Sequence, residues 1–275
     1  MRKFLLLPIA VIAGCTLETS TTQLVPEITV EQDDRDHIKY SPNTLNSALK
    51  RTRDDVIRST DPKTANAFWV ERDLEIDAVT HYISNCEFPT VGEKLRTMVI
   101  TDQSLRLLFT ELVRREDHFL SREEAALTRI GLIERLRRID EFNTETLKSM
   151  LEGREWFRDD KDGKDAAYNA WLIVQHADRN PEFQRTILPL IEAALGTPGT
   201  SNQNYAYLHD RIAIAEGRPQ LYGTQGRCVD LGIWEPYEII DEAQVDIRRA
   251  DMDLDTVADN ITRLKDRCVI AASKN

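Results

Sequence analysis

The sequence lacks the short motifs by which many enzymes are identified. It contains no nucleophile elbow, phosphate-binding loop, zinc motif or dinucleotide fingerprint. It also lacks a long apolar run, since the apolar stretch near its start is shorter than the roughly 20 residues that cross a bilayer. Positive charge is scarce, with 36 Lys and Arg against 47 Asp and Glu. The resulting net charge of -11 argues against nucleic acid or an anionic lipid surface as a partner.

The chain begins with the pattern of a bacterial export signal. Basic residues precede an uncharged apolar stretch at 4–13, which is typical of a cleaved signal peptide over residues 1–14. The segment Ile-Ala-Gly-Cys at 12–15 resembles the lipobox of bacterial lipoproteins, which implies a thioether between Cys15 and diacylglycerol. Because each buried CH₂ contributes about 0.8 kcal/mol, two or three acyl chains hold a protein firmly on a membrane. An ordinary secretory signal with a chance cysteine is the alternative interpretation.

The residues after the lipobox predict where the protein lies. Residue 16 is Thr, and resemblance to Gram-negative lipoproteins, in which Asp at this position marks the inner membrane, implies attachment to the outer membrane and a domain facing the periplasm. Residues 15–43 contain few apolar residues and no sustained period, which predicts a lipidated flexible tether. The membrane is therefore the predicted partner through the anchor. A further protein or small-molecule partner is left unidentified.

The remaining chain has the composition of a packed helical domain. Hydrophobic residues make up 41% of the sequence and charged residues 30%, so a sizeable core is feasible. Apolar residues recur at helical spacing, so we predict a mainly α fold with N-terminal helices at 44–104 and a helical domain at 105–275. The individual helices are predicted over 65–86, 102–117, 121–141, 144–151, 164–177, 180–195, 201–217 and 255–270.

Several of these helices have recognisable boundary residues. Asn180 followed by Pro181 is a typical helix start, and Ser201 is a typical N-cap. Gly217 is a typical residue just beyond a helix end, where a left-handed backbone is needed. The helix at 164–177 is apolar on nearly every side, which predicts a buried position.

The pattern changes in the C-terminal third of the chain. Alternating apolar and polar residues at 220–225 and 233–239 predict two short strands. Gly226 and Gly232 bracket the predicted turn region. We therefore expect one small β-hairpin beside the helices.

Three cysteines remain after the lipobox cysteine, and an oxidising compartment favours one disulfide among them. We predict the pair Cys228–Cys268, because Cys228 follows the first strand and Cys268 lies on the inner face of the last helix. A loop of about 40 residues gives about 4 kcal/mol of stabilisation in the chain-entropy model. Cys86 ends an apolar helix face and suits a buried thiol, although it could instead pair with either of the others.

Five motifs stand out in the C-terminal two thirds of the chain. They are Ala-Trp-Leu-Ile-Val-Gln-His-Ala-Asp at 170–178, Phe-Gln at 183–184, Ala-Tyr-Leu with Asp-Arg at 206–211, Glu-Gly-Arg-Pro-Gln-Leu-Tyr-Gly-Thr-Gln at 216–225, and Val-Asp-Ile-Arg-Arg-Ala at 245–250. In order and spacing, residues 105–262 resemble an uncharacterised bacterial family, domain of unknown function 6624. The resemblance implies a compact, largely α-helical domain and supplies no reaction. His118 departs from the family, which tends to have Gln there, so any role of that Gln is in doubt.

His176 is the candidate general acid or base. It ends an apolar helix, where the helix dipole and the nearby Asp178 favour a protonated imidazole. With Asp178 or Asp210 it would serve an enzyme, whereas the alternative is a histidine that binds free carbonyls at the helix end. Residues two apart on a helix point in different directions, so no metal pair is expected here. The acidic run at 159–163 lacks the spacing of a calcium loop, and we predict no metal and no cofactor.

Polar residues of the same motifs form a candidate binding set. Gln184 lies on an apolar helix face and must find partners, since an unpaired buried amide costs about 1–3 kcal/mol. Ion pairs between Asp210-Arg211 and Arg248-Arg249 are expected to fix geometry. We also predict that segments 175–178 and 222–225 touch. The candidate binding residues are Gln175, Gln184, Arg211, Gln220, Tyr222, Thr224 and Gln225.

Two functions of different classes are consistent with these patterns. The first is a lipid-anchored cell-envelope protein whose helical domain binds a ligand or partner of unknown specificity, with the polar cluster as a scaffold. The second is an envelope enzyme, for example a hydrolase, that uses His176. An open cleft shared by His176, Gln184, Asp210 and Gln225 would favour the enzyme, and a closed, fully paired core would favour the scaffold. We favour the first, because no complete catalytic constellation is recognisable.

Overall fold

The computed structural model describes residues 31–32, 38–39, 65–114 and 122–268. The described chain is mainly helical, which confirms the predicted fold class, and it carries a small β-hairpin in its C-terminal third. Within the described ranges, no helix is both long and apolar enough to cross a membrane. The chain forms two compact units, and helices α3 and α4 each contribute to both of them.

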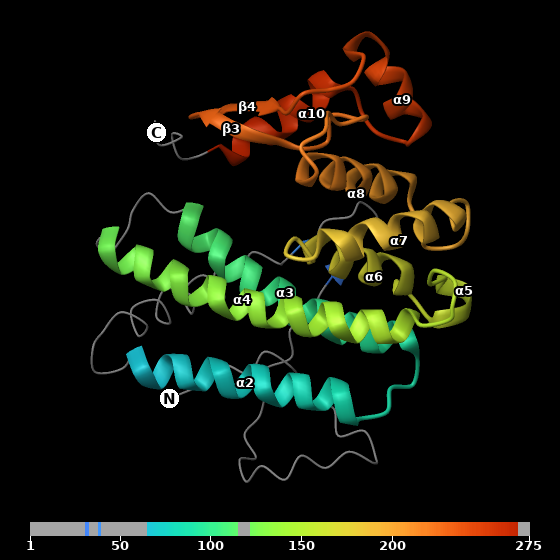
Figure 1. Cartoon of the computed structure of the whole chain (residues 1–275). Coiled ribbons are helices and arrows are strands. Elements are labelled where there is room, and N and C mark those ends of the chain that lie inside the picture. Colours follow the sequence, from blue (N-terminus) through green and yellow to red (C-terminus); the bar gives the residue numbers. More distant parts are fainter. Residues whose placement is uncertain (1–30, 33–37, 40–64, 115–121, 269–275) are drawn as a thin grey trace. The chain divides into compact units, whose positions relative to one another are not determined.

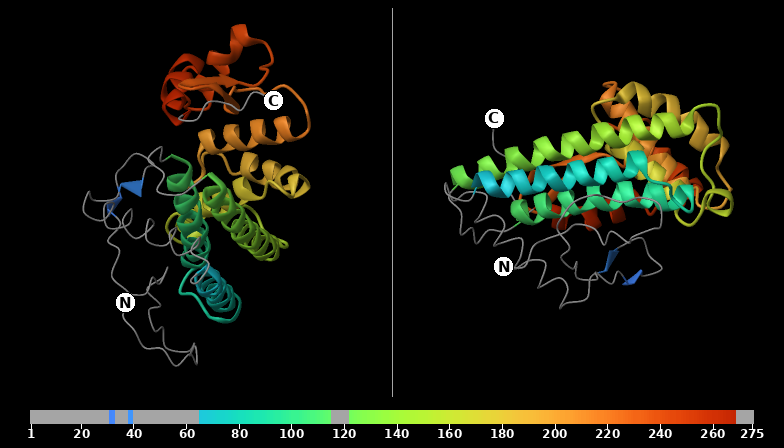
Figure 2. Two further views of the ribbon diagram at one scale, coloured as in Figure 1. Left: turned by 90° about the vertical axis from the view of Figure 1, so that its left-hand side faces the viewer. Right: turned by 90° about the horizontal axis from the view of Figure 1, so that it is seen from below.

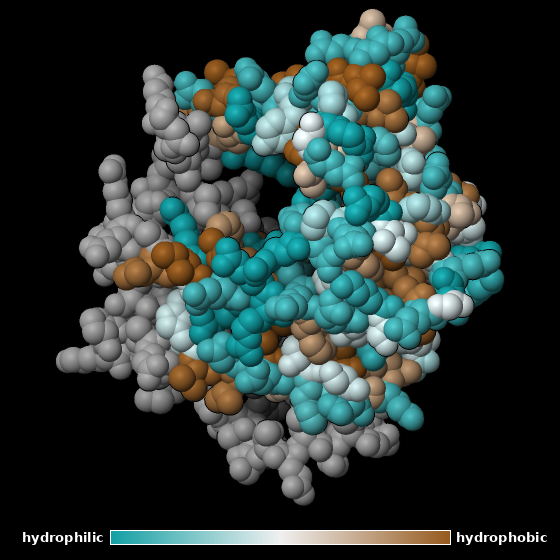
Figure 3. All heavy atoms as spheres, viewed as in Figure 1, coloured by the Kyte–Doolittle hydropathy of each residue, from teal (hydrophilic) through white to brown (hydrophobic). Residues whose placement is uncertain are grey.

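The first unit contains helix α2 (Ala65–Asn85) and the larger parts of α3 (Val91–Arg114) and α4 (Arg122–Leu151) (Figure 1). Helix α2 covers the predicted 65–86 and ends before Pro89, as expected of a residue that cannot continue a helix. The apolar core of this unit is formed by the buried side chains of Ile76, Leu105, Leu136 and Ile139. Figure 3 shows mainly hydrophilic side chains along the visible face of α4.

Helices α2 and α4 are joined by an arginine that is packed on an aromatic ring. The Arg135 guanidinium lies 4.2 Å from the centre of the Trp69 ring and donates a 2.7 Å hydrogen bond to Asp73. Gly131 allows the close approach, because a Cβ there would lie 2.7 Å from the Trp69 ring. A second arginine, Arg138, also donates to Asp73, at 2.6 Å. The contact therefore combines a cation–π interaction with shared ion pairs.

Two predicted helix boundaries are wrong. Helix α3 begins at Val91 rather than 102, because the buried Leu95 and Met98 start the helical spacing earlier than we expected. Helix α4 is one helix where the sequence predicted two, at 121–141 and 144–151. Its buried positions continue through Asn143 and Thr144 to Leu147, so the polar residues at the junction of the two predicted helices face the interior.

The second unit contains the shorter helices and the hairpin. Its elements are α5 (Asp159–Asp162), α6 (Ala166–His176), α7 (Pro181–Ala193), α8 (Asn202–Ala215), β3 (Gly226–Asp230), β4 (Ile233–Pro236), α9 (Val245–Asp251) and α10 (Val257–Leu264), with 3-10 turns at Glu242–Gln244 and Lys265–Arg267. Helix α7 packs against both α6 and α8 (Figure 2). Helix α6 buries most of its residues, as predicted, while Tyr168 on its surface is 36% exposed.

The predicted boundary residues act as expected. The Asn180 side chain accepts a 3.1 Å hydrogen bond from the Phe183 amide at the start of α7, and Pro181 occupies the first turn. The Ser201 hydroxyl accepts from the Asn204 amide at the start of α8. Gly217 follows α8 with φ of +69°, the left-handed conformation in which glycine avoids a steric cost. These residues fix the lengths of α7 and α8.

The hairpin starts later than predicted. Strand β3 pairs antiparallel with β4, with Gly226 opposite Pro236 and Arg227 opposite Glu235. Residues 220–225, expected as the first strand, form a loop instead. The physical reason is that the amides of Leu221, Tyr222 and Thr224 bind a buried carboxylate on α8, and only Gln220 forms a bridge with the chain beyond β4.

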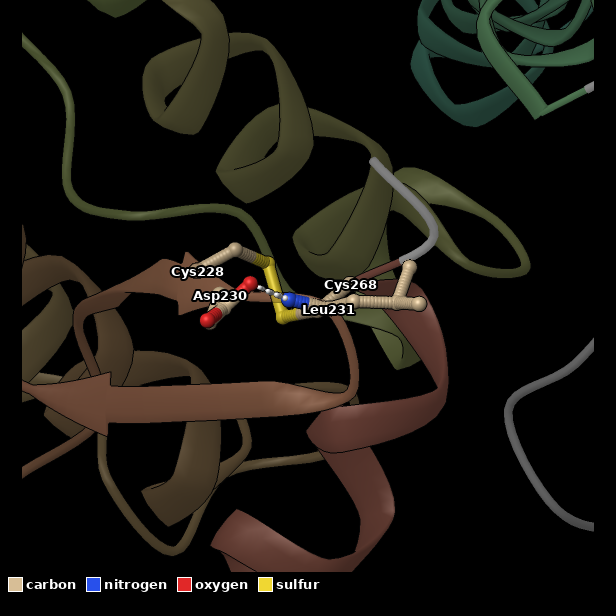
Figure 4. The surroundings of a disulfide bond; sticks show 4 residues. All are labelled: Cys228, Asp230, Leu231 and Cys268. Carbon is tan, nitrogen blue, oxygen red and sulfur yellow. Dashed lines mark hydrogen bonds between the residues drawn. A yellow bond between two sulfur atoms is a disulfide. The ribbon is translucent and has the colours of Figure 1, made fainter. Parts of the chain in front are cut away.

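The predicted disulfide Cys228–Cys268 is present, with Cα atoms 5.4 Å apart (Figure 4). It joins β3 to the residue after the turn that follows α10, and the Gly232 amide donates a 2.7 Å hydrogen bond to the Cys268 carbonyl beside it. The expected thiol at Cys86 is wrong, because this residue is disulfide-bonded as well.

Short strands occur within the segment predicted as a tether. Strand β1 (Glu31–Gln32) pairs antiparallel with β2 (Ile38–Lys39). The predicted signal peptide, the lipidation site Cys15 and the rest of the tether lie outside the described residues.

Candidate functional site

The centre of the polar cluster is Asp210 on α8, whose side chain is 0% exposed. Its carboxylate accepts hydrogen bonds from the amides of Leu221 at 2.8 Å, Tyr222 at 3.1 Å and Thr224 at 2.9 Å. The Thr224 hydroxyl donates a further bond at 2.9 Å. A buried carboxylate is stable only when such donors replace water. Asp210 therefore holds the 220–225 loop against α8.

A glycine allows the loop to turn around this carboxylate. Gly223 has φ of +68°, and a Cβ there would lie 2.7 Å from the Ile239 side chain. Its carbonyl accepts a 3.4 Å hydrogen bond from the amide group of Asn260 on α10, which is also buried. The Tyr-Gly-Thr sequence thus supplies a left-handed turn between two residues that bind Asp210.

Gln220 closes the base of the loop. Its Oε1 accepts a 2.8 Å hydrogen bond from the Gln225 amide, and its Nε2 donates 2.8 Å bonds to the carbonyls of Gln225 and Tyr237. The Gln225 side chain in turn donates to the Thr224 hydroxyl at 3.1 Å and to the Tyr207 carbonyl on α8 at 3.5 Å. Both glutamines therefore serve the loop itself.

Two arginines of α9 bind the other side of the loop. Arg249 is 0% exposed and donates a 2.6 Å hydrogen bond to the Tyr222 carbonyl and a 2.9 Å bond to Asp255. Arg248 donates a 2.8 Å bond to the Leu221 carbonyl. The expected ion pairs of these arginines with Asp210-Arg211 are therefore wrong. Asp210 binds the amides of the loop, and the arginines bind its carbonyls.

Gln184 finds a partner within the helices. Its side chain is buried, and its Nε2 donates a 3.0 Å hydrogen bond to the Val174 carbonyl near the end of α6. The bond ties α7 to α6. The Val174 carbonyl also accepts a 3.1 Å hydrogen bond from the Ala177 amide, so Gln184 is its second donor at the end of α6.

A second polar region lies where α6 meets α8. The Trp171 indole donates a 2.8 Å hydrogen bond to the Asn204 carbonyl, and Asp178 forms a 2.6 Å ion pair with Arg211. Residues four apart share a helix face, so Gln175 lies on the same face of α6 as Trp171. Asp178 follows two residues after α6 ends at His176. We call Trp171, Gln175, Asp178 and Arg211 the α6–α8 seam.

Two buried polar atoms of the seam have no hydrogen-bond partner among the described residues. Gln175 is 5% exposed, and its Oε1 has no hydrogen-bond partner among the described residues; neither does the buried Nε of Arg211. The outer edge of the seam is open, since the side chains of Arg211 and Asp178 are 33% and 60% exposed. A buried polar atom without a partner costs about 1–3 kcal/mol, so a water molecule or a ligand group is expected at each of these atoms.

The three candidate catalytic residues have different surroundings. Asp178 pairs with Arg211, whereas Asp210, the preceding residue of α8, binds the 220–225 loop. His176 is half-buried at the end of α6, and its catalytic role stays a prediction. The segments 175–178 and 222–225 both bind α8, and a direct contact between them also stays a prediction.

A group of aromatic residues on α8 was missed in the sequence. The His209 ring lies 5.5 Å from the Tyr222 ring and 6.1 Å from the Tyr205 ring, centre to centre. Burial, together with the nearby charge of Glu192, raises the pKa of Tyr205 to about 12. Tyr205 and His209 are four residues apart on α8, and this spacing was the signal available beforehand.

The chain was also compared with known proteins. The model of the family of unknown function DUF6624 matches residues 89–272, more than half of the chain. Neither the curated proteins nor the solved structures give a match. All five motifs noted in the sequence lie within the matched range, including the loop that binds Asp210 and the arginines that hold its carbonyls. The chain therefore belongs to the family of unknown function DUF6624.

Proposed function

We propose that this chain is a lipoprotein of the bacterial cell envelope, anchored through Cys15 to the outer membrane and facing the periplasm, whose helical domain binds a ligand or a protein partner. The export signal and lipobox support the anchor. The state of Asp210 supports binding rather than catalysis, because a buried carboxylate that already accepts several backbone hydrogen bonds has little capacity left for a substrate. This saturation of Asp210 is the observation that carries the proposal.

The seam offers the best-supported binding surface in the second unit. Of the candidate binding residues, Gln184, Gln220 and Thr224 use their side chains to join elements of the fold. Gln175 and Arg211 each keep a buried polar atom that is available to a further group. The guanidinium group of Arg211 carries several N–H donors and is partly exposed, so we expect a ligand with an acceptor oxygen.

The anchor is tested by Cys15→Ser. The variant has no sulfur to carry the thioether, so we expect it in the soluble periplasmic fraction or with its signal peptide uncut. Wild-type protein should fractionate with outer membranes and carry a diacylglyceryl group on its mature N-terminus by mass spectrometry. A processed Cys15→Ser protein that still fractionates with membranes would contradict the proposal.

The same mass spectra address the disulfide of Cys86. A thioether sulfur cannot take part in a disulfide, and Cys228 is already paired with Cys268. In a lipidated molecule we therefore expect Cys86 as a free thiol or in a disulfide with another molecule. A peptide that links Cys15 to Cys86 in protein taken from membranes would exclude lipidation of that molecule.

Binding at the seam is tested by a metabolite-library thermal shift on the full-length protein in detergent. A ligand at 100 times its Kd stabilises the folded state by about 2.7 kcal/mol, a rise in Tm of roughly 5–10 °C for a domain of this size. We expect Arg211→Gln to abolish the rise. Arg185→Gln is the matched control, since it removes an ion pair between α7 and Glu216, the residue after α8. A hit whose Tm rise is equal in both variants would remove the seam as its site.

A further inference from the structure

An open surface hollow of about 330 Å³ lies in the first unit, and most of its lining side chains are exposed. It is lined by Asp77, Thr80, His81, Ser84 and Asn85 of α2 and by Phe142 of α4. All the α2 residues precede the range matched by the family model, so most of the lining lies outside that match, whereas Phe142 lies within it. Its volume is at the lower end for ligand pockets, about 300–1,000 Å³, which suits one ring rather than an extended molecule.

The hydroxyl groups in the hollow act as acceptors. Thr80 donates its hydroxyl proton to the Asp77 carbonyl at 3.1 Å, and Ser84 donates to the Thr80 carbonyl at 2.8 Å. A hydroxyl has one donor and two acceptor sites, so both oxygens keep lone pairs for a ligand. A ligand must therefore bring O–H or N–H groups to this side of the hollow.

His81 supplies a donor beside these acceptors. The Asn85 side-chain nitrogen donates to Nδ1 of His81 at 3.2 Å and to the His81 carbonyl at 2.9 Å. Because Nδ1 accepts a hydrogen bond, the neutral imidazole carries its proton on Nε2. The hollow thus presents donors and acceptors side by side.

The negative charge of Asp77 in the hollow is partly neutralised by an arginine beside it. Asp77 forms a 2.7 Å ion pair with Arg138 through Oδ1, which leaves Oδ2 as a further acceptor. The arginine reduces the local negative potential, so a bound cation is disfavoured relative to a neutral donor-rich ligand. Phe142 adds an apolar ring to this otherwise polar lining.

We propose that this hollow binds a single sugar ring. A sugar has many hydroxyl groups that both donate and accept, which matches the lining of α2, and a face of C–H groups that packs on an aromatic ring such as Phe142. An apolar ligand would leave the polar lining unpaired, which disfavours it. The site shares no residue with the α6–α8 seam and adds a second binding function.

Saturation-transfer NMR on the full-length protein, in a detergent without sugar groups, tests the proposal. The probes are N-acetylglucosamine and glucose, with cyclohexanol as an apolar ring and glycerol as an acyclic polyol. We expect saturation transfer to at least one of the two sugars and much less to cyclohexanol or glycerol. Transfer to neither sugar, or equal transfer to all probes, would overturn the proposal.

Variants place the binding in the hollow. Phe142→Leu and His81→Ala should each raise the Kd for the sugar at least fivefold. Thr186→Ala is the matched control, because that hydroxyl also donates to its own helix but lies on α7. His81 is exposed, so His81→Ala is expected to fold even if Phe142→Leu does not. An unchanged Kd for the sugar in a folded His81→Ala protein would refute the site. Arg211→Gln should leave sugar binding intact, which distinguishes sugar binding in the hollow from ligand binding at the seam.

Discussion

Asp210→Asn is expected to lower the free energy of unfolding by about 3–5 kcal/mol. The new amide group keeps the shape of the side chain but turns one acceptor oxygen into a donor. That donor would face backbone amides of Leu221, Tyr222 and Thr224, which now bind the carboxylate. At least one buried amide then loses its partner, and the loop loses the charge that holds it. Urea unfolding followed by circular dichroism measures the change.

Asp178→Asn is the matched control for this result. Asp178 is also an aspartate that binds groups of α8, but its side chain is 60% exposed and its ion pair with Arg211 is screened by water. We expect a loss below about 1 kcal/mol. A loss of similar size in both variants would show that burial at Asp210 has no special role, and a loss below 1 kcal/mol in Asp210→Asn would remove the scaffold interpretation.

Removal of the Cys228–Cys268 disulfide is expected to cost up to about 4 kcal/mol. The bond closes a loop of 40 residues that contains β4, α9 and α10, so it restricts the unfolded chain strongly. The Cys228→Ala/Cys268→Ala double variant is preferable to a reducing agent, because a reductant would also open the disulfide of Cys86. Alanine avoids placing a hydroxyl at Cys268, which is buried beside Trp234 and Leu264.

The double variant should unfold at a lower urea concentration with a similar m-value. The single variants are less informative, since each leaves a thiol that can exchange with the disulfide of Cys86. A double variant as stable as the wild type would mean that the disulfide is not needed to hold the hairpin against the C-terminal helix. The apolar cluster around Trp234 would then be sufficient.

Local patterns predicted the helix ends that depend on one or two side chains. Asn180, Ser201 and Gly217 act through groups within a few residues of themselves, so their roles could be read from the sequence. The extra length of α3 and the continuity of α4 could not, because buried polar residues such as Thr144 resemble a helix break until their packing is known.

The loop at 220–225 shows why the rest of the site was missed. Its alternating residues resemble a strand, but the partner that decides its shape, Asp210, lies on another helix. The same holds for Arg249, which was expected to pair with Asp210 and instead binds the Tyr222 carbonyl and Asp255. The sequence indicated that the polar residues of these distant segments form a cluster. Residue types alone, however, do not show which donor binds which acceptor within it. The Cys228–Cys268 pair was predictable because strand and helix topology brings these residues together.

The arrangement gives the family motifs a physical meaning. The motif at 206–211 supplies Asp210, the motif at 216–225 supplies the loop that surrounds it, and the motif at 245–250 supplies the arginines that hold the loop carbonyls. The three motifs therefore form one buried network. The motif at 170–178 contributes the other half of the seam, where unpaired polar atoms are available for a ligand.

Native-state hydrogen exchange tests the closed-scaffold account most directly. It is measured at the amides of Leu221, Tyr222 and Thr224, with an interior α7 amide such as that of Ile187 as the reference. If the loop is part of a closed core, these amides exchange only when the second unit unfolds as a whole, at rates close to that of the reference. Exchange of the loop amides orders of magnitude faster than Ile187 would mean that the loop opens locally. It would then be a mobile edge of a cleft, and the scaffold role of Asp210 would be contradicted.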